Sequence, residues 1–304
     1  MMIVGYSRKF TSTPYVPTHE GTRGVFCAGW TNHGVVTMDY ITIATLGNAA
    51  AFGSYYHNCM KHAAVNSSTR GVFGGGIVGS TVLNTMAYIT ILTTGNSTDF
   101  GDLITARYDL GGCSSDTRGL FICGYNAGMK NIIEYITIAT TSGGTDFGDA
   151  TSIAYNTTSL ASKTRGVSAL GYTGVRSNVM DYVTIATTGN ATDFGDITVT
   201  RSAMAGASSN FRGLWFGGIN GGAQNVIDYI TVATPSNATD FGDIIAAKYS
   251  QAAFASSTRA VVGGGTSVTN VIQYVTTATT GNTTDFGDLT SARYTLAACS
   301  DFSK

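Results

Sequence analysis

Charged side chains return at fixed places in this sequence, and one of them is an arginine with the chemistry to bind an anion. It stands in a Thr-Arg-Gly context or a close variant of it, and successive copies lie 47, 48, 47, 47 and 47 residues apart. The six positions are Arg23, Arg70, Arg118, Arg165, Arg212 and Arg259. A ring of guanidinium groups would hold phosphate or carboxylate. Because the position is the same in every repeat, we favour the alternative, a structural role in which each arginine pairs with a nearby carboxylate.

The second recurring motif is Asp-Phe-Gly-Asp, which has two acids that could ligate a metal. It is centred on Phe100, Phe147, Phe194, Phe241 and Phe286, with a degenerate copy at 51–54. Protein kinases have these letters once, together with a Gly-rich loop and a catalytic loop, so five copies at one period exclude that reading. Calcium is the other candidate, but its loops need about 6 to 8 oxygens from closely alternating acids. Asx turns explain the same letters, so we predict no metal site.

The residues of hydrolytic and redox chemistry are sparse. The four histidines are confined to the first 62 residues, without the spacing of a catalytic triad or a metal site. The five cysteines are an odd number without Cys-x-x-Cys spacing, so we expect small buried hydrophobic residues rather than disulfides or metal ligands. We therefore predict that the protein is not an enzyme and has no catalytic residues and no cofactor.

Charge and hydropathy narrow the class of partner. The net charge is -1, charged residues make up 12 %, and no run of lysines and arginines could follow a phosphate backbone, so nucleic acid is not an expected partner. No apolar run approaches the roughly 20 residues of a membrane span. The amino terminus lacks the apolar core of a signal peptide, so we expect synthesis in a cytoplasm without membrane insertion.

The spacing of the motifs predicts the fold. A third marker, Tyr-(Ile/Val)-Thr, begins at Tyr40, Tyr88, Tyr135, Tyr182, Tyr229 and Tyr274. Each repeat reads as four short strands: a Gly-ended apolar strand, a β-branched strand, the Asp-Phe-Gly-Asp strand and a small-residue strand. Four strands in such a period are typical of a propeller blade, whereas a β-solenoid, the alternative, has shorter coils. We predict an all-β, six-bladed β-propeller over residues 22–304, preceded by an N-terminal arm, 1–21.

The two ends of the chain predict how the ring closes. Residues 286–304 run through the acidic motif and a small-residue strand, then stop where a Thr-Arg-Gly would begin. Thr22 has no such strand before it, because Pro14 and Pro17 make that segment unfit for an inner strand. We therefore expect residues 293–300 to be the innermost strand of the blade whose other strands come from residues 24–54. The C-terminal strand would thus complete the N-terminal blade.

One face of the predicted disc carries the connections that differ between repeats. The Ser-Ser-Thr-Arg and Thr-Thr-Gly-Asn connections are nearly constant, whereas those after the Gly-ended strand vary in every repeat. We predict that the recognition surface lies on the variable side. Its candidate residues are aromatic or basic: Trp30, His33, Tyr55, Tyr56, Arg107, Tyr125, Tyr172, Arg201, Lys248 and Arg293. The alternative is that the cations only solvate the rim of the channel.

The repeat resembles the kelch repeat, in which a double-glycine strand end, an aromatic residue and a basic residue recur. The matching features are Gly263-Gly264, Tyr274 and Arg293 in the last repeat, with equivalents along residues 23–300. The sequence departs from that pattern in carrying Phe where kelch repeats have Trp. The resemblance implies a propeller with a binding role and names no partner.

The low charge and the nearly identical Gly-, Thr- and Asn-rich copies also resemble repeats of tailed-bacteriophage structural proteins. That resemblance implies a virion component in a tail, fibre or capsid-associated position. Its partners would be other virion proteins or host surface glycan, with several copies in a larger assembly. A cellular kelch-like adaptor or lectin is the second hypothesis.

Overall fold

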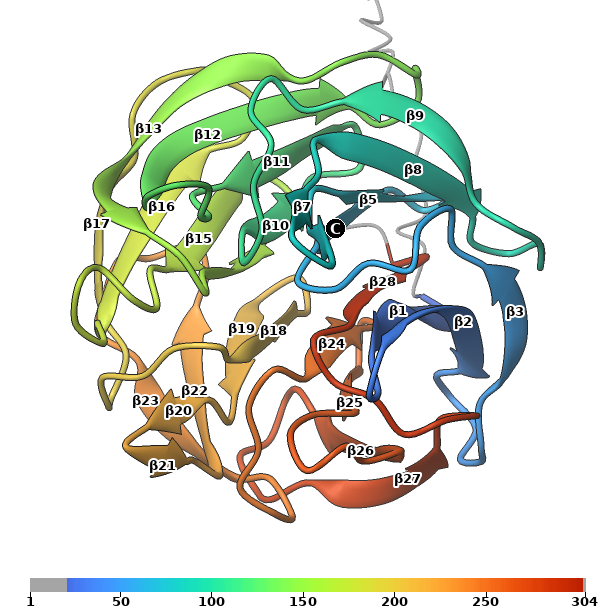
Figure 1. The fold of residues 1–304 in the computed structure, drawn as a ribbon. Helices are drawn as coiled ribbons and strands as arrows, with labels where there is room; N and C mark the ends of the chain where they lie inside the picture. Colours follow the sequence, from blue (N-terminus) through green and yellow to red (C-terminus); the bar gives the residue numbers. More distant parts are fainter. Residues whose placement is uncertain (1–20, 303–304) are drawn as a thin grey trace, which may run out of the picture.

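The computed structural model describes residues 21–302, which form a ring of six four-stranded antiparallel sheets (Figure 1). The predicted fold class, an all-β six-bladed propeller, is confirmed. The predicted N-terminal arm lies outside the described residues except for Gly21. Residues 21–302 contain no helix long and apolar enough to cross a membrane.

The strands of each blade follow the predicted order from the channel outward. Blade 1 contains β28 (Ala297–Ser300), β1 (Arg23–Trp30), β2 (Gly34–Thr42) and β3 (Ala50–Ser54). Blade 2 contains β4 (Ala63–Asn66), β5 (Arg70–Gly74), β8 (Thr85–Thr90) and β9 (Thr98–Asp102). Blade 3 contains β10 (Gly111–Ser114), β11 (Arg118–Ile122), β12 (Lys130–Thr137) and β13 (Thr145–Ala154).

The other three blades repeat the pattern. Blade 4 contains β14 (Thr158–Ala161), β15 (Arg165–Ala169), β16 (Val179–Thr184) and β17 (Thr192–Asp196). Blade 5 contains β18 (Ala205–Ser208), β19 (Arg212–Phe216), β22 (Val226–Thr231) and β23 (Thr239–Asp243). Blade 6 contains β24 (Ala252–Ala255), β25 (Arg259–Gly263), β26 (Val271–Thr276) and β27 (Thr284–Asp288). Two short hairpins, β6 (Ile77–Val78) with β7 (Thr81–Val82) and β20 (Ile219–Asn220) with β21 (Gly222–Ala223), extend from blades 2 and 5.

The last strand closes the ring as predicted. Strand β28 pairs antiparallel with β1, with Ala298 opposite Phe26. The strand begins at Ala297 rather than at Arg293, because Arg293 is held in a buried ion pair and Thr295 has a positive φ of 54°. Beyond the strand, the Asp301 carboxylate accepts hydrogen bonds from the backbone N–H groups of Thr22 and Arg23 at 2.7 and 2.8 Å. The two ends of the described chain therefore hold each other in place through strand pairing and hydrogen bonds.

The glycine of Thr-Arg-Gly lets adjacent blades approach closely. A Cβ built at Gly24 would lie 1.9 Å from the ring of Phe254, which projects from the inner strand of the preceding blade. At Gly213 the same atom would meet the Leu160 side chain at 2.4 Å. The one repeat that has alanine here, Ala260, occurs in blade 6. The inner-strand residue that corresponds to Leu160 in the blade before it is Ala207, the smallest of the set, so residue size is matched across this blade boundary.

The six repeated arginines bind the blades together, but not through the carboxylates we expected. Each guanidinium lies over the ring of the tyrosine on the neighbouring strand, 4.3 to 4.7 Å from its centroid. The register places this tyrosine two residues along the partner strand, on the same face of the sheet. Each arginine also donates to a backbone carbonyl of the next blade, as Arg70 does to Ile138 at 3.0 Å. The predicted carboxylate partner was wrong, because the acids of Asp-Phe-Gly-Asp lie on the outermost strand of the blade, beyond the strand that carries the tyrosine.

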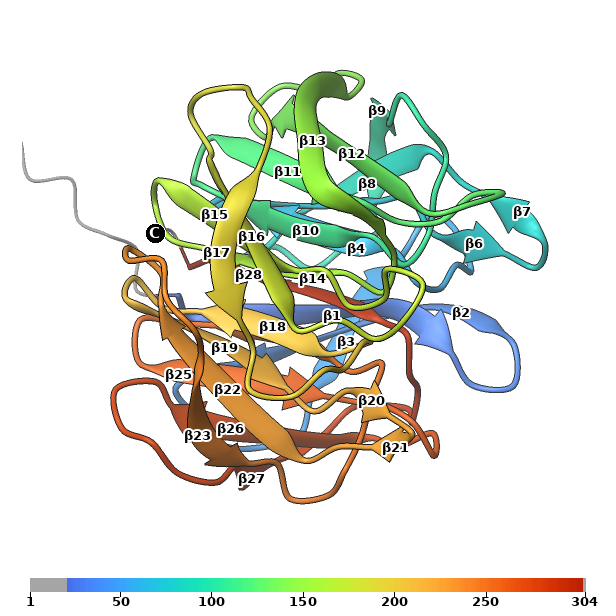
Figure 2. The same cartoon turned by 90° about the vertical axis from the view of Figure 1, so that its left-hand side faces the viewer.

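The two faces of the disc differ in their connections. One face, here called the constant face, carries the Ser-Ser-Thr-Arg and Thr-Thr-Gly-Asn turns. It also carries the first and last described residues, since a Cβ on Gly21 would meet the Phe302 side chain at 2.8 Å. The opposite, variable face carries the connections between the second and third strands and those between blades, and both short hairpins extend from it (Figure 2).

Candidate functional site

Three of the cations assigned to the recognition surface are buried, so that part of the prediction was wrong. Each arginine forms an ion pair with an acid on the third strand of its blade: Arg107 with Glu134 at 2.6 Å, Arg201 with Asp228 at 2.9 Å and Arg293 with Asp39 at 2.8 Å. All six side chains are 0 % exposed. Burial lowers the pKa of Arg107 and Arg201, and the partner carboxylates oppose that shift. These arginines stabilise the fold and are not available to a ligand.

The acids of these pairs also anchor the connection that arrives from the preceding blade. Asp228 accepts the backbone N–H of Thr198 at 3.1 Å, and Asp39 accepts that of Thr290 at 3.2 Å. In blade 6 the same place is taken by Gln273, which accepts the Ile245 N–H at 2.9 Å. The signal that could have revealed this is the acid directly before Tyr-(Ile/Val)-Thr, which alternation in a strand places on the face opposite the tyrosine.

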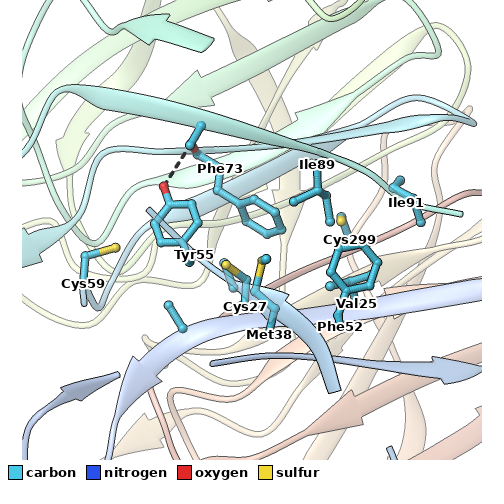
Figure 3. Close-up of a cluster of buried hydrophobic side chains, with 13 residues drawn as sticks. Val25, Cys27, Met38, Phe52, Tyr55, Cys59, Phe73, Ile89, Ile91 and Cys299 are labelled. Atoms are coloured by element: carbon cyan, nitrogen blue, oxygen red, sulfur yellow. Dashed lines mark hydrogen bonds between the residues drawn. The ribbon is translucent and has the colours of Figure 1, made fainter. Parts of the chain in front are cut away.

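Tyr55 is also inaccessible at the predicted recognition surface, because it is only 4 % exposed. Figure 3 shows its ring in a buried cluster with Cys27 and Cys59, and its hydroxyl donates to the Phe73 carbonyl at 3.4 Å. Burial raises the pKa of Tyr55 well above its usual value. All five cysteines are buried, as predicted, and desolvation raises the pKa of Cys59 to about 12. This cluster is a hydrophobic core between blades.

His62 lies against the same core without a hydrogen-bond partner for either ring nitrogen among residues 21–302. Its imidazole stacks on Tyr55, with ring centroids 5.3 Å apart, and is only 5 % exposed. Burial lowers the pKa of His62 to about 3. Leu110 and Leu296 occupy the corresponding place in blades 3 and 1, so the site has the size and apolar character for leucine.

We expect His62→Leu to make the protein more resistant to acid. The folded protein holds this histidine neutral, so stability is present above the unfolded-state pKa of about 6.5 and is lost as the pH falls from there toward 3. At pH 5 the loss is about 2 kcal/mol, which the leucine variant avoids. Urea unfolding of both proteins at pH 8 and pH 5 measures the difference. An equal loss in both proteins contradicts the prediction, and Leu110→Val, at the matching place in blade 3, is the control.

The remaining predicted residues lie on the variable face with different exposure. Tyr56 is 57 % exposed, His33 is exposed and bonded through Nδ1 to Asn32, and Trp30 is half-buried. Lys248 is half-buried and donates to the Thr266 carbonyl at 3.0 Å. Trp30, His33 and Tyr56 belong to blade 1 and Lys248 precedes the inner strand of blade 6, so none of the four lies in the sector of blades 3 and 4 that contains Tyr125 and Tyr172.

Tyr125 and Tyr172 instead belong to a continuous row of four half-buried tyrosines, here called the tyrosine arc. The rings follow one another across blades 3 and 4 in the order Tyr108, Tyr125, Tyr155 and Tyr172, with centroid separations of 5.6, 5.5 and 5.1 Å. Tyr108 and Tyr155, which sequence reasoning missed, come from the connections that lead to the inner strands. The structure thus brings together two predicted residues and two new ones.

The fold does not require aromatic residues at these places. In blades 3 and 4 the two tyrosines exchange backbone hydrogen bonds, as Tyr108 and Tyr125 do at 3.1 and 2.8 Å. The equivalent bonds in blade 2 join Met60 and Ile77, and those in blade 5 join Ser202 and Ile219. The same pairing joins Trp30 and Tyr294 in blade 1, so it forms around aromatic, aliphatic and polar side chains and does not depend on tyrosine.

The inner end of the arc adjoins the mouth of the central channel. The Lys61 ammonium lies 2.9 Å from the Asp109 carboxylate and 5.1 Å from the centroid of the Tyr108 ring. Burial raises the pKa of Asp109, and the Lys61 charge opposes that shift. A hollow of about 80 Å³ opens at this mouth, lined by Lys61, Asp109, Asn156 and Ser250 among others. Asp109 and Asn156 directly follow Tyr108 and Tyr155, so the hollow and the arc are contiguous.

The backbone at the channel mouth forms a rigid collar. One residue in each blade has a positive φ between 53° and 62°: Lys61, Asp109, Asn156, Ala203, Ser250 and Thr295. The collar is bonded from blade to blade, since the Asp109 N–H donates to the Lys61 carbonyl at 2.9 Å and the Lys61 N–H to the Thr295 carbonyl at 3.0 Å. Residues other than glycine rarely adopt this conformation, and strain of this kind is found where a site is held in fixed geometry.

Within residues 21–302, no three His, Cys, Asp or Glu side chains are grouped so that they could hold a metal ion. The sequence matches no known family model, and no curated protein is detectably similar to it. On the variable face a row of aromatic rings adjoins a hollow lined by a cation and two acceptors, an arrangement that is compatible with a binding role.

Proposed function

We propose that the protein is a non-enzymatic binding propeller whose recognition surface is the variable face, in the sector of blades 3 and 4. One observation carries this proposal: four tyrosines occupy backbone positions that blades 2 and 5 fill with Met60, Ile77, Ser202 and Ile219. Half-buried aromatic rings that the fold does not need are typical of contact surfaces, because they supply apolar area at a low cost in side-chain entropy.

We further propose that the protein is a component of a bacteriophage virion, in a tail, fibre or capsid-associated position, where it contacts other virion proteins or host surface glycan. The resemblance of its low-charge repeats to those of phage structural proteins supports this assignment. So does the separation of the two faces, because a disc held by its constant face would present the arc outward. A cellular kelch-like adaptor or lectin is the second candidate, which the resemblance to kelch repeats supports.

The composition of purified virions tests this proposal. Gradient-purified particles from the source of the sequence should contain peptides of this chain in a fixed ratio to the capsid protein. The ratio should persist through a second gradient at high salt, which removes adhering proteins. Particles that contain capsid and tail proteins without this chain, or its recovery from uninfected cells alone, would contradict the virion assignment and favour the cellular alternative.

A further inference from the structure

We propose that the tyrosine arc and the adjoining hollow form a binding site for a neutral saccharide chain, with one sugar ring in the channel mouth and the following rings across the tyrosines. This inference rests on the proposed binding role of the variable face and identifies the class of ligand. It uses Lys61 and Asp109, neither of which the sequence pattern marked.

The first argument is the pairing of aromatic faces with polar groups that both donate and accept. A pyranose ring presents a C–H face that packs on an aromatic ring and a rim of hydroxyl groups that need donors and acceptors. At the inner end of the arc, Lys61 supplies a donor, Asp109 an acceptor and Asn156 both. Tyr108 and Tyr155 lie beside them, so the two kinds of contact are within reach of one sugar residue.

The second argument is electrostatic. Lys61 and Asp109 form an ion pair at 2.9 Å, so their charges cancel at the channel mouth. Burial, and after it the nearby phenol of Tyr172, raises the pKa of Tyr155. The charges of Asp109 and Lys61 shift this pKa in opposite directions. Because no net charge faces the hollow at this end, the site suits a neutral sugar better than an acidic one.

The third argument is size and shape. Pockets for small ligands typically occupy about 300 to 1,000 Å³, whereas the hollow encloses only about 80 Å³. It can therefore take one end of a chain, and the tyrosine arc must supply most of the contact. Asp109 and Asn156 line the hollow and directly follow Tyr108 and Tyr155, so a linear chain can extend from the hollow to the arc. The four rings follow one another at 5.1 to 5.6 Å and are tilted against one another by 48 to 66°, so a chain along the arc would meet ring faces and ring edges in turn.

The collar preorganises the proposed site. The positive-φ residues and the backbone bonds between Lys61, Asp109 and Thr295 fix the floor of the hollow. In blades 3 and 4, two backbone hydrogen bonds in each tyrosine pair fix the arc. Preorganised groups lose little entropy on binding, which matters for sugars because their hydroxyl groups must be taken from water.

The test is titration of the folded protein with neutral di- to hexasaccharides of glucose, galactose, mannose and N-acetylglucosamine, monitored by saturation-transfer NMR and calorimetry. At least one series should bind, with affinity rising with chain length. Tyr155→Ala and Tyr172→Ala should each weaken it about tenfold or more. Ile219→Ala, at the place in blade 5 that corresponds to Tyr172, is the matched control and should leave affinity unchanged.

A second variant keeps the test decisive if the alanine variants are unstable. Asp109→Asn preserves the size of the side chain while removing the charge that pairs with Lys61, and it should weaken binding of the same saccharide in a protein that still unfolds cooperatively. If no neutral saccharide binds, or if binding is the same in the wild type and in all three site variants, the inference is overturned. Either result leaves the virion test standing, so the two failures can be told apart.

Discussion

Deleting residues 297–304 is expected to abolish the cooperative folding of the whole propeller. The deletion removes β28, which pairs with β1, and leaves the inner edge of blade 1 exposed. It also removes the Ser300 hydroxyl, which donates to the Ala255 carbonyl at 2.8 Å, and the Asp301 carboxylate, which binds the start of β1. Together these losses are expected to exceed a typical global stability of about 5 to 15 kcal/mol.

Circular dichroism melting and size-exclusion chromatography measure this effect. The truncated chain should show no sharp transition and should elute as expanded or aggregated material. A chain that lacks only residues 303–304 and keeps β28 and Asp301 is the control and should melt as the full chain does. A truncated chain with the wild-type melting temperature would show that the ring does not depend on β28.

Replacing Arg201 with methionine is expected to cost about 3 to 5 kcal/mol of unfolding free energy, although neither residue of its ion pair touches solvent. The variant leaves the Asp228 carboxylate buried without its cation. The double variant Arg201→Met with Asp228→Asn should recover a large part of the loss, because the amide keeps an acceptor for the Thr198 N–H and carries no charge. Blade 6 already uses an amide in this place, Gln273.

Urea unfolding of the two single variants and the double variant, treated as a double-mutant cycle, separates the two contributions. Blade 4 offers an internal comparison, because Ala154 stands there where blade 5 has Arg201. The buried Asp181 in that blade is held by Thr151, and burial raises its pKa. A single variant as stable as the wild type, or a double variant no better than the single one, would refute the assigned role of the pair.

The repeat period was sufficient to predict the fold, because each motif has one structural task that is the same in every blade. Gly24 and its equivalents make room for a side chain of the preceding blade, and Arg23 and its equivalents stack on a tyrosine two residues along the next strand. Such contacts repeat with the period and are therefore visible in one sequence. The closing strand was predicted for the same reason, since the final repeat has a strand that the first one lacks.

The candidate site was only partly predictable, because its residues depend on which blades are neighbours. Arg293 and Asp39 come from opposite ends of the chain, so no local pattern shows that the arginine is buried. Tyr108 and Tyr155 follow strands of the outer edge, and only the assembled ring places Tyr108 beside Tyr125 and Tyr155 between Tyr125 and Tyr172. A tyrosine stands at this offset in four repeats, Tyr108, Tyr155, Tyr249 and Tyr294, so the sequence alone does not single out the two that join the arc.

A crystal structure of the protein soaked with the tightest-binding neutral oligosaccharide tests the account most directly. The account predicts sugar density in the hollow beside Lys61 and Asp109, continuing over Tyr155 and Tyr172 on the variable face. Density on the constant face, or bound sugar that leaves all four tyrosines uncovered, would contradict it.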